Sequence, residues 1–379
     1  MDDDDWAVRT PWYRTMRSRR TDEPHRTATP LELLFDLCFV VAVSEAAGGL
    51  HHALSRGEAG HGTSGYVLVF FAIWWAWMNF TWFASSFDVD DVPYRLTTLV
   101  QIGGGLVLAA GVDRAMTGDD FTVITIGYVI MRLALVSQWV RVWRSDPEYG
   151  ATALRFAVGI CLVQVGWVLR LALPDEWFLA GFVVLGLADL AVPVWAERSG
   201  QTRWHPRHIA ERYGLFTVIM LGESVFSVVT AVRAGLDAGA QSRTLIGVAV
   251  AGVLILFSLW WVYFDQPTHY RLTELGPSFR WGYGHYLIFA ASAAVGAGLA
   301  VVVDHDLGAA HIGPTVTALT VTVPVAVYLL AVRLLHLGRQ RSRLAGAALP
   351  VAAVVVLGCT FTPAPVLLVA AVMVVVVAL

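Results

Sequence analysis

The sequence predicts an all-α, polytopic integral membrane protein with about twelve transmembrane helices. Of its 379 residues, 57% are hydrophobic and 15% are charged, whereas soluble globular proteins carry about a quarter charged residues. The charges gather at the N-terminus, and later stretches run almost without charge for about 20 residues, the length that a helix needs to cross the hydrocarbon core. The basic residues also alternate from loop to loop, as they do in multi-pass proteins. A lipid bilayer is therefore the predicted environment.

The first six spans follow a polar tail, residues 1–30, that we expect in the cytoplasm. Apolar runs bounded by charges, glycine or proline begin near Leu31, Gly65, Arg95, Phe121, Ala153 and Glu176. The first run opens with Glu32 and Asp36 in place of an uninterrupted apolar core, so it does not fit a cleaved signal peptide. Residues 31–198 are predicted to form a first six-helix repeat.

The second six-helix repeat is predicted over residues 199–379. Its apolar runs begin near His208, Arg243, Trp281, Gly313, Ala345 and Pro363. The last two are short and are separated only by residues 360–365, so one hairpin that barely crosses the membrane is an alternative to two full spans.

The distribution of arginine predicts the orientation of the spans. With the N-terminus inside, most of the 26 basic residues, all of them arginines, fall in cytoplasmic loops and span ends, as the positive-inside rule requires. Arg56, Arg114, Arg170, Arg233 and Arg243 fall outside. The pattern predicts that both termini are cytoplasmic.

Weak internal similarity predicts that the two halves arose by duplication. Three matches occur in the same order: Glu32 and Glu45 with Glu211 and Glu223, Trp74-Trp75 and Asn79 with Trp260-Trp261 and Asp265, and Arg95 before Gly103–Gly105 with His285 before a small-residue stretch. Because six is even, the halves would share one orientation, an arrangement that one large class of secondary transporters uses. The alternative is that apolar helices of similar composition resemble one another.

Ionisable residues inside spans are functional candidates because an unpaired charge in hydrocarbon costs several kcal/mol. Glu45 and Glu223 lie at matched depths, about 20 Å from the cytoplasmic ends of their helices at 1.5 Å per residue. They are predicted to form a buried acidic pair suited to proton or cation handling. The alternative is that each is neutralised and holds helices together.

Arg132 lies within the fourth span without an acid nearby in its own helix. It therefore needs a partner on another helix. We expect Arg132 to pair with Glu45, Glu223 or Asp189, the last of which lies four residues before Pro193.

Polar residues also share faces near the cytoplasmic ends of two spans. Glu32 and Asp36 are four residues apart, and His208, Arg212 and Glu223 fall within a narrow stripe at 100° per residue. Such a stripe is typical of a wet cavity, although His208 and Arg212 could instead extend to the interface.

Tryptophans concentrate at Trp74-Trp75 and Trp260-Trp261. They predict either an aromatic lining for a cation or polyene or plain helix packing. On the outer side, two loops carry histidine and aspartate: His51, His52 and His61 in one, and Asp304, His305, Asp306 and His311 in the other. Nothing in their spacing defines a metal site, so no metal is predicted.

Several function classes lack their usual parts. The chain has no lysine, no CxxC, no HExxH, no GxSxG and no phosphate-binding loop of the GxxxxGK[ST] type, which argues against ATP-driven pumping, zinc proteolysis and serine hydrolysis. The formal net charge of −3 gives no reason to expect a nucleic-acid partner. The three cysteines lie in apolar runs and read as small core residues. No cofactor is predicted.

Several segments resemble the bacterial low temperature requirement protein A (LtrA) family. They are residues 29–40 (TPLELLFDLCFV), 87–91 (FDVDD), 208–224 (HIAERYGLFTVIMLGES), 261–265 (WVYFD) and 284–289 (GHYLIF). Cys38 departs from the aliphatic residue expected there, and the last two spans are generic. The resemblance implies a multi-pass protein of the bacterial inner membrane, named for growth in the cold, with characteristic positions at Glu32, Asp36, Arg95, His208, Glu211, Arg212, Glu223, Asp265 and His285.

The sequence leaves three functions open. The leading interpretation is a transporter or channel-like protein that moves an ion or small solute by means of buried carboxylates. The second is an intramembrane enzyme for a lipid or isoprenoid, with Asp36, Asp265 or Glu223 as the acid. The third is a non-catalytic membrane factor for cold or envelope stress.

Overall fold

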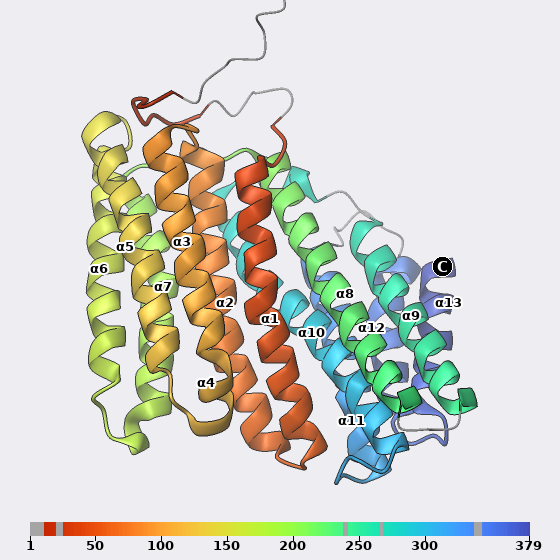
Figure 1. The fold of residues 1–379 in the computed structure, drawn as a ribbon. Helices are drawn as coiled ribbons and strands as arrows, with labels where there is room; N and C mark the ends of the chain where they lie inside the picture. Colours follow the sequence, from red (N-terminus) through yellow and green to blue (C-terminus); the bar gives the residue numbers. More distant parts are fainter. Residues whose placement is uncertain (1–10, 20–25, 238–241, 266–267, 337–342) are drawn as a thin grey trace, which may run out of the picture. The chain divides into compact units, whose positions relative to one another are not determined.

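The computed structural model describes residues 11–19, 26–237, 242–265, 268–336 and 343–379. The helices are α1 (Pro30–Ser55), α2 (Ala59–Phe87), α3 (Val92–Ala110), α4 (Val112–Gly118), α5 (Thr122–Ser145), α6 (Gly150–Arg170), α7 (Phe178–Ala196), α8 (Pro206–Asp237), α9 (Ser242–Phe264), α10 (Leu275–Asp306), α11 (Pro314–Leu335), α12 (Arg343–Cys359) and α13 (Pro365–Ala378) (Figure 1). Short 3₁₀ helices cover Asp175–Trp177, Glu197–Ser199 and His269–Arg271. The described residues contain no strand, which confirms the all-α prediction.

Among the described residues, ten helical segments are long and apolar enough to cross a membrane. They correspond to the first ten predicted spans, with α3 and α4 together forming the third. The helices α12 and α13 have 17 and 14 residues, which is short of the roughly 20 residues that a perpendicular span needs. The count of twelve spans, the duplication and the orientation stay predictions.

The chain divides into two compact units that do not coincide with the predicted repeats. Unit 1 comprises residues up to Phe39, Trp75–Gly111 and Phe121–Ile209. Unit 2 comprises Val40–Trp74, Val112–Asp120 and the residues from Ala210 onward. The long helices α1 and α2 contribute to both units. The two six-helix repeats, residues 31–198 and 199–379, stay a prediction.

Unit 1 is built on close helix crossings. In it α3 packs against α5, α5 against α6, and α6 against α7 (Figure 1). A Cβ atom on Gly127 of α5 would lie 2.4 Å from the backbone nitrogen of Leu108 on α3, so the crossing requires glycine. Between α5 and α6, the rings of Trp139 and Phe156 stack with their centroids 4.2 Å apart.

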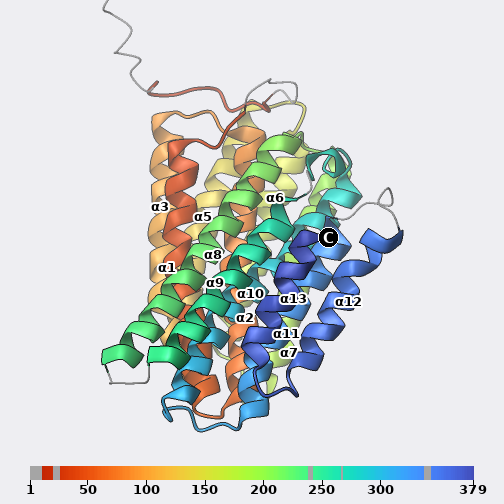
Figure 2. The ribbon, with the colours of Figure 1, turned by 90° about the vertical axis from the view of Figure 1, so that its right-hand side faces the viewer.

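Unit 2 centres on α10, most of which is buried. In this unit α11 packs on α10, α12 on α11, and α13 on both α12 and α9 (Figure 2). A Cβ atom on Gly298 of α10 would lie 2.1 Å from the carbonyl oxygen of Thr320 on α11. The small-residue stretch of the ninth span therefore serves a close α10–α11 contact.

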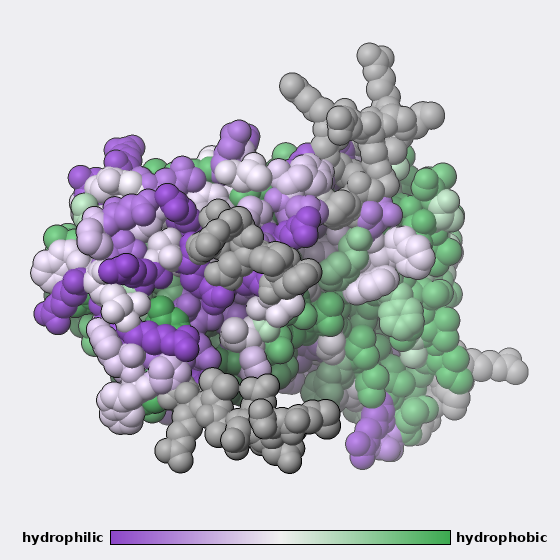
Figure 3. Space-filling view, turned by 90° about the horizontal axis from the view of Figure 1, so that it is seen from above, coloured by the Kyte–Doolittle hydropathy of each residue, from purple (hydrophilic) through white to green (hydrophobic). Residues whose placement is uncertain are grey.

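Residues 11–19 form an N-terminal strap across the polar end of unit 1. The backbone N–H groups of Arg14 and Ser18 donate to the carboxylates of Asp91 and Asp146, each over 2.8 Å. Met16 is fully buried in the core cluster of this unit. In the view from above, hydrophilic side chains gather on one side of the surface, and hydrophobic side chains cover most of the other side (Figure 3). Part of the predicted polar tail is thus a packed element.

Candidate functional site: a buried carboxylate and histidine cluster

The first turn of α1 places the Glu32 carboxylate. The backbone N–H of Thr29 donates to Oε2 of Glu32 over 2.8 Å, and the backbone N–H of Glu32 donates to Oγ1 of Thr29 over 3.2 Å. This reciprocal pair is a capping box, with Pro30 at the first helical position. Local sequence therefore holds a buried carboxylate at the helix N-terminus, where the helix dipole favours negative charge.

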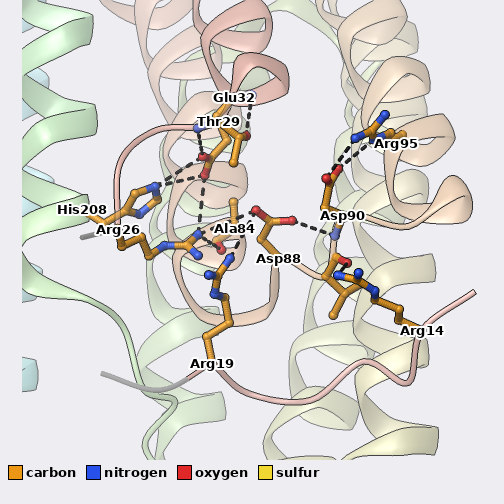
Figure 4. Close-up of polar contacts among 11 residues, drawn as sticks. Arg14, Arg19, Arg26, Thr29, Glu32, Ala84, Asp88, Asp90, Arg95 and His208 are labelled. Atoms are coloured by element: carbon orange, nitrogen blue, oxygen red, sulfur yellow. Dashed lines mark hydrogen bonds and ion pairs between the residues drawn. The ribbon is translucent and has the colours of Figure 1, made fainter. Parts of the chain in front are cut away.

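Glu32 meets a histidine from the start of α8. Nε2 of His208 lies 3.2 Å from Oε1 and 3.3 Å from Oε2 of Glu32, and both side chains are buried (Figure 4). His208 is itself positioned, because its backbone N–H donates to Nδ1 of His205 over 3.2 Å. The backbone N–H of His205 in turn donates to Oγ of Ser85 over 3.1 Å.

Two arginines and a second carboxylate also belong to the site. Nη2 of Arg26 donates to the carbonyl oxygen of Ala84 over 2.7 Å and lies 3.8 Å from Glu32 and 4.0 Å from Asp88. Nη1 of Arg19 lies 3.7 Å from Asp88 (Figure 4). We refer to Arg19, Arg26, Glu32, Asp88 and His208 as the Glu32 cluster.

Burial changes the acidity of the groups in this cluster. It raises the pKa of Asp88 to about 6, with a further increase from the Glu32 carboxylate, and the two arginines only partly offset these effects. Burial likewise lowers the pKa of Arg26. Asp88 therefore changes its charge close to neutral pH.

Neither Arg26 nor Asp88 was assigned a role from the sequence. Arg26 could have been identified as a site residue from its position just before the Thr29 capping box. Asp88 could have been identified because it belongs to the segment 87–91, which resembles the LtrA pattern. Arg95, another characteristic position, instead forms an exposed ion pair of 2.7 Å with Asp90.

Asp36 lies one turn beyond Glu32 on α1 and is fully buried. Its Oδ1 accepts a hydrogen bond of 2.7 Å from Nε1 of Trp77. The spacing of four residues thus places both acids inside unit 1, as expected for one helix face.

Arg132 pairs with Asp189, one of its three expected partners, and both are buried. Oδ2 of Asp189 also accepts from Nε1 of Trp167 over 2.8 Å and from the hydroxyl of Tyr128 over 3.3 Å. Polar contacts of Asp189 on α7 thereby join this helix to α5 and α6.

The expected Glu45–Glu223 pair is only half correct. Glu223 is buried, and its Oε1 accepts a hydrogen bond of 2.9 Å from Oγ of Ser227. It also interacts with Ser44 and Glu45. Glu45, however, is exposed, so the prediction of two buried acids is wrong. At 100° per residue, the 13 positions after Glu32 turn Glu45 about 140° away from it.

The start of α8 is buried more deeply than an interfacial helix end. His208 and Arg212 are both fully buried, so the alternative that they extend to the interface is wrong. Glu211 is half-buried.

His285 belongs to a buried network in unit 2 that includes an unpredicted residue, His336. Nε2 of His285 lies 3.0 Å from the hydroxyl of Tyr263 and 3.3 Å from Nε2 of His336. Nδ1 of His285 lies 2.7 Å from the carbonyl oxygen of Trp281. Burial lowers the pKa of His336 to about 4, so His336 is neutral at physiological pH.

The two tryptophan pairs have opposite environments. Trp74 and Trp75 are buried, and Trp74 packs edge-on against Tyr286 with ring centroids 5.4 Å apart. Trp260 and Trp261 are 44% and 53% exposed, so an aromatic lining by these two residues is wrong. Asp265, just past the end of α9, is also exposed.

Of the histidines and aspartates expected in the two outer loops, His51 at the end of α1 and Asp304 at the end of α10 form a pair in unit 2. Nε2 of His51 lies 2.7 Å from Oδ2 of Asp304, which also accepts 2.9 Å from Oγ of Ser55. Within the described residues, no group of three or more histidine, cysteine, aspartate or glutamate side chains is placed to hold a metal ion.

The sequence was compared with curated proteins, solved structures and family profiles. The chain is 26% identical over 321 residues to an uncharacterized protein of Rhizobium meliloti (strain 1021), which covers 78% of this chain and 72% of that protein. No solved structure matches the chain. The profile of the bacterial low temperature requirement A protein (LtrA) matches residues 27–379, which include Glu32, Asp88 and His208. The chain therefore belongs to the bacterial LtrA family of membrane proteins.

Proposed function

We propose that this protein moves an ion or small solute across the bacterial inner membrane, and that proton uptake by the Glu32 cluster controls the movement. The observation that carries the proposal is the buried contact of Glu32 with His208 and Arg26 at the end of a membrane helix. Ionisable groups kept inside a membrane protein are costly and are typical of ion pathways and proton relays.

The charge balance of the cluster supports this role. The Asp88 carboxylate lies beside the guanidinium groups of Arg19 and Arg26. Proton uptake by Asp88, whose pKa is about 6, removes the negative charge that faces both groups. Because the ion pairs with Asp88 are then lost, protonation weakens the hold of Arg26 on this end of unit 1.

Each unit also contains a further buried acid within a span, which supports a role in ion movement. Asp36 follows on α1 within unit 1, and Glu223 lies in α8 within unit 2. The Arg132–Asp189 pair has a different character, because Tyr128 and Trp167 also bind its carboxylate; we assign it a stabilising role.

The proposal is tested with the full chain in liposomes that contain pH-sensitive and ion-sensitive dyes. We expect flux in the wild type and a loss of at least tenfold in Glu32→Gln and Glu223→Gln. Asp90→Asn is the matched control, since Asp90 is exposed beside the cluster and has a positive φ of 47° that asparagine tolerates. The transport proposal fails if wild-type flux across common ions does not exceed that of empty liposomes, or if the three variants retain equal flux.

A further inference from the structure

Unit 2 contains a cavity of about 580 Å³ at the junction between α9 and α10. Residues of the α9–α10 connection, the first three turns of α10 and the end of α11 line it. The volume lies in the range of small-ligand pockets, about 300 to 1,000 Å³.

The lining of the cavity is cationic on one side. Two positively charged side chains, Arg271 and Arg280, line the cavity, and Glu274 is the single carboxylate in its lining. Neither arginine forms an ion pair with another described residue of the chain. Arg271 is half-buried and Arg280 is exposed, and the planar guanidinium group suits bidentate binding of phosphate.

Arg271 is held in place by the protein. Its Nη1 donates to the carbonyl oxygen of Leu335 over 2.7 Å, and its guanidinium lies 5.9 Å from the ring centroid of Tyr270. This hydrogen bond fixes Nη1, so the other N–H groups of the planar guanidinium are oriented before a ligand binds. Such preorganisation lowers the entropic cost of binding.

A second, independent observation comes from Trp281, which also lines the cavity. The side chain is 2% exposed, and its indole N–H is buried without a hydrogen-bond partner among the described residues. A buried donor without a partner is unfavourable, and an anion that accepts this hydrogen would remove the cost. The N-terminus of the 32-residue helix α10 adds positive potential at the same place.

We propose that this cavity binds a phosphate group, with Arg271, Arg280 and the Trp281 indole N–H as its donors. The group belongs either to an anionic phospholipid or to a soluble phosphate compound. The cavity also has an apolar wall, Leu334 and Leu335, and Leu334 is 75% exposed, which gives an acyl chain a surface on which to lie. This site is independent of the Glu32 cluster, which belongs to unit 1.

The test measures binding to the full chain in a neutral detergent. One arm titrates short-chain phosphatidylglycerol and follows bound lipid by native mass spectrometry, with phosphatidylcholine as the reference. The other arm adds inorganic phosphate as a competitor and measures its own binding by calorimetry. A lipid ligand binds in the first arm and resists phosphate, whereas a soluble ligand binds or competes in the second.

Each removal of a charged donor should weaken binding about tenfold. The variants are Arg271→Gln and Arg280→Gln, with Trp281→Phe to remove the N–H while keeping an aromatic ring. Arg207→Gln is the matched control, because Arg207 is an exposed arginine at the start of α8 and does not line the cavity. Size-exclusion profiles and melting temperatures establish that each variant is folded.

Weakening in the cavity variants, together with unchanged binding in Arg207→Gln, supports the proposal in either arm. Three results would overturn it. These are failure of both probes to bind the folded wild type, equal affinity in wild type and cavity variants, and equal weakening in Arg207→Gln.

Discussion

The carboxylate of Glu32 lies 3.2 Å from Nε2 of His208, although 176 residues separate them in the chain. The contact joins the first turn of α1 to the first turn of α8 inside unit 1. Each side chain is positioned by neighbours in its own segment. The capping box with Thr29 positions Glu32, and a hydrogen bond to His205, just before α8, positions the backbone of His208. Changes at Glu32 should therefore act on the electrostatics of the cluster more than on the helices.

Glu32→Gln should lower the pKa of Asp88 below its value of about 6. Glutamine keeps an oxygen for the capping box but removes the negative charge that raises the pKa of Asp88. Infrared spectroscopy of the protonated carboxyl band as a function of pH measures the change, with Asp88→Asn to assign the band. An unchanged titration would show that Glu32 does not act on Asp88.

Asp88 should make stability depend on pH in the acid range. Its pKa is about 6 when folded, against 3.8 for an ordinary aspartate, so the folded state holds the proton more tightly. Its contribution to stability is fully present below pH about 4 and is lost as the pH rises through 6, a difference of at most about 3 kcal/mol.

The variant Asp88→Asn keeps the neutral form at every pH. We expect its melting temperature, relative to the wild type, to rise between pH about 4 and 7. Asp90→Asn should show a smaller trend of opposite sign, because Arg95 lowers the pKa of Asp90. A difference between Asp88→Asn and wild type that is constant with pH would contradict the assignment.

Arg132→Gln should destabilise unit 1 by about 3 kcal/mol, because it leaves the Asp189 carboxylate buried without its charge partner. Adding Asp189→Asn should restore part of the loss. The exposed pair between Arg203 and Glu148, 2.9 Å apart, supplies the control, since Arg203→Gln should cost well under about 1 kcal/mol. Equal melting temperatures for Arg132→Gln and Arg203→Gln would rule out the stabilising role.

Gly127→Ala should destabilise the α3–α5 crossing by about 2 kcal/mol or more. The new Cβ would lie 2.4 Å from the backbone nitrogen of Leu108, and backbone cannot move aside as a flexible side chain can. On α3, Gly103→Ala meets nothing within 4 Å, so it should be neutral or slightly stabilising through better helix propensity. Thermal unfolding of the two variants in detergent makes the comparison.

Local sequence determined the helices of this protein, since runs of apolar residues bounded by charge, glycine and proline predicted the ten long spans. It also determined that Glu32, Asp36, Arg132, Asp189, His208 and Glu223 would be buried, because charge inside a span is costly and stands out against apolar neighbours. Composition and spacing act along one helix, so they predict spans and mark the costly charges within them.

Only the tertiary structure decided which residues meet. It selected Asp189 for Arg132, brought Arg26 and Asp88 to Glu32, and placed His336 beside His285. It also left Glu45, Trp260 and Trp261 exposed, although their sequence pattern matches buried residues. The physical reason is that helical periodicity shows which residues share a face, whereas the partner of that face depends on how neighbouring helices pack.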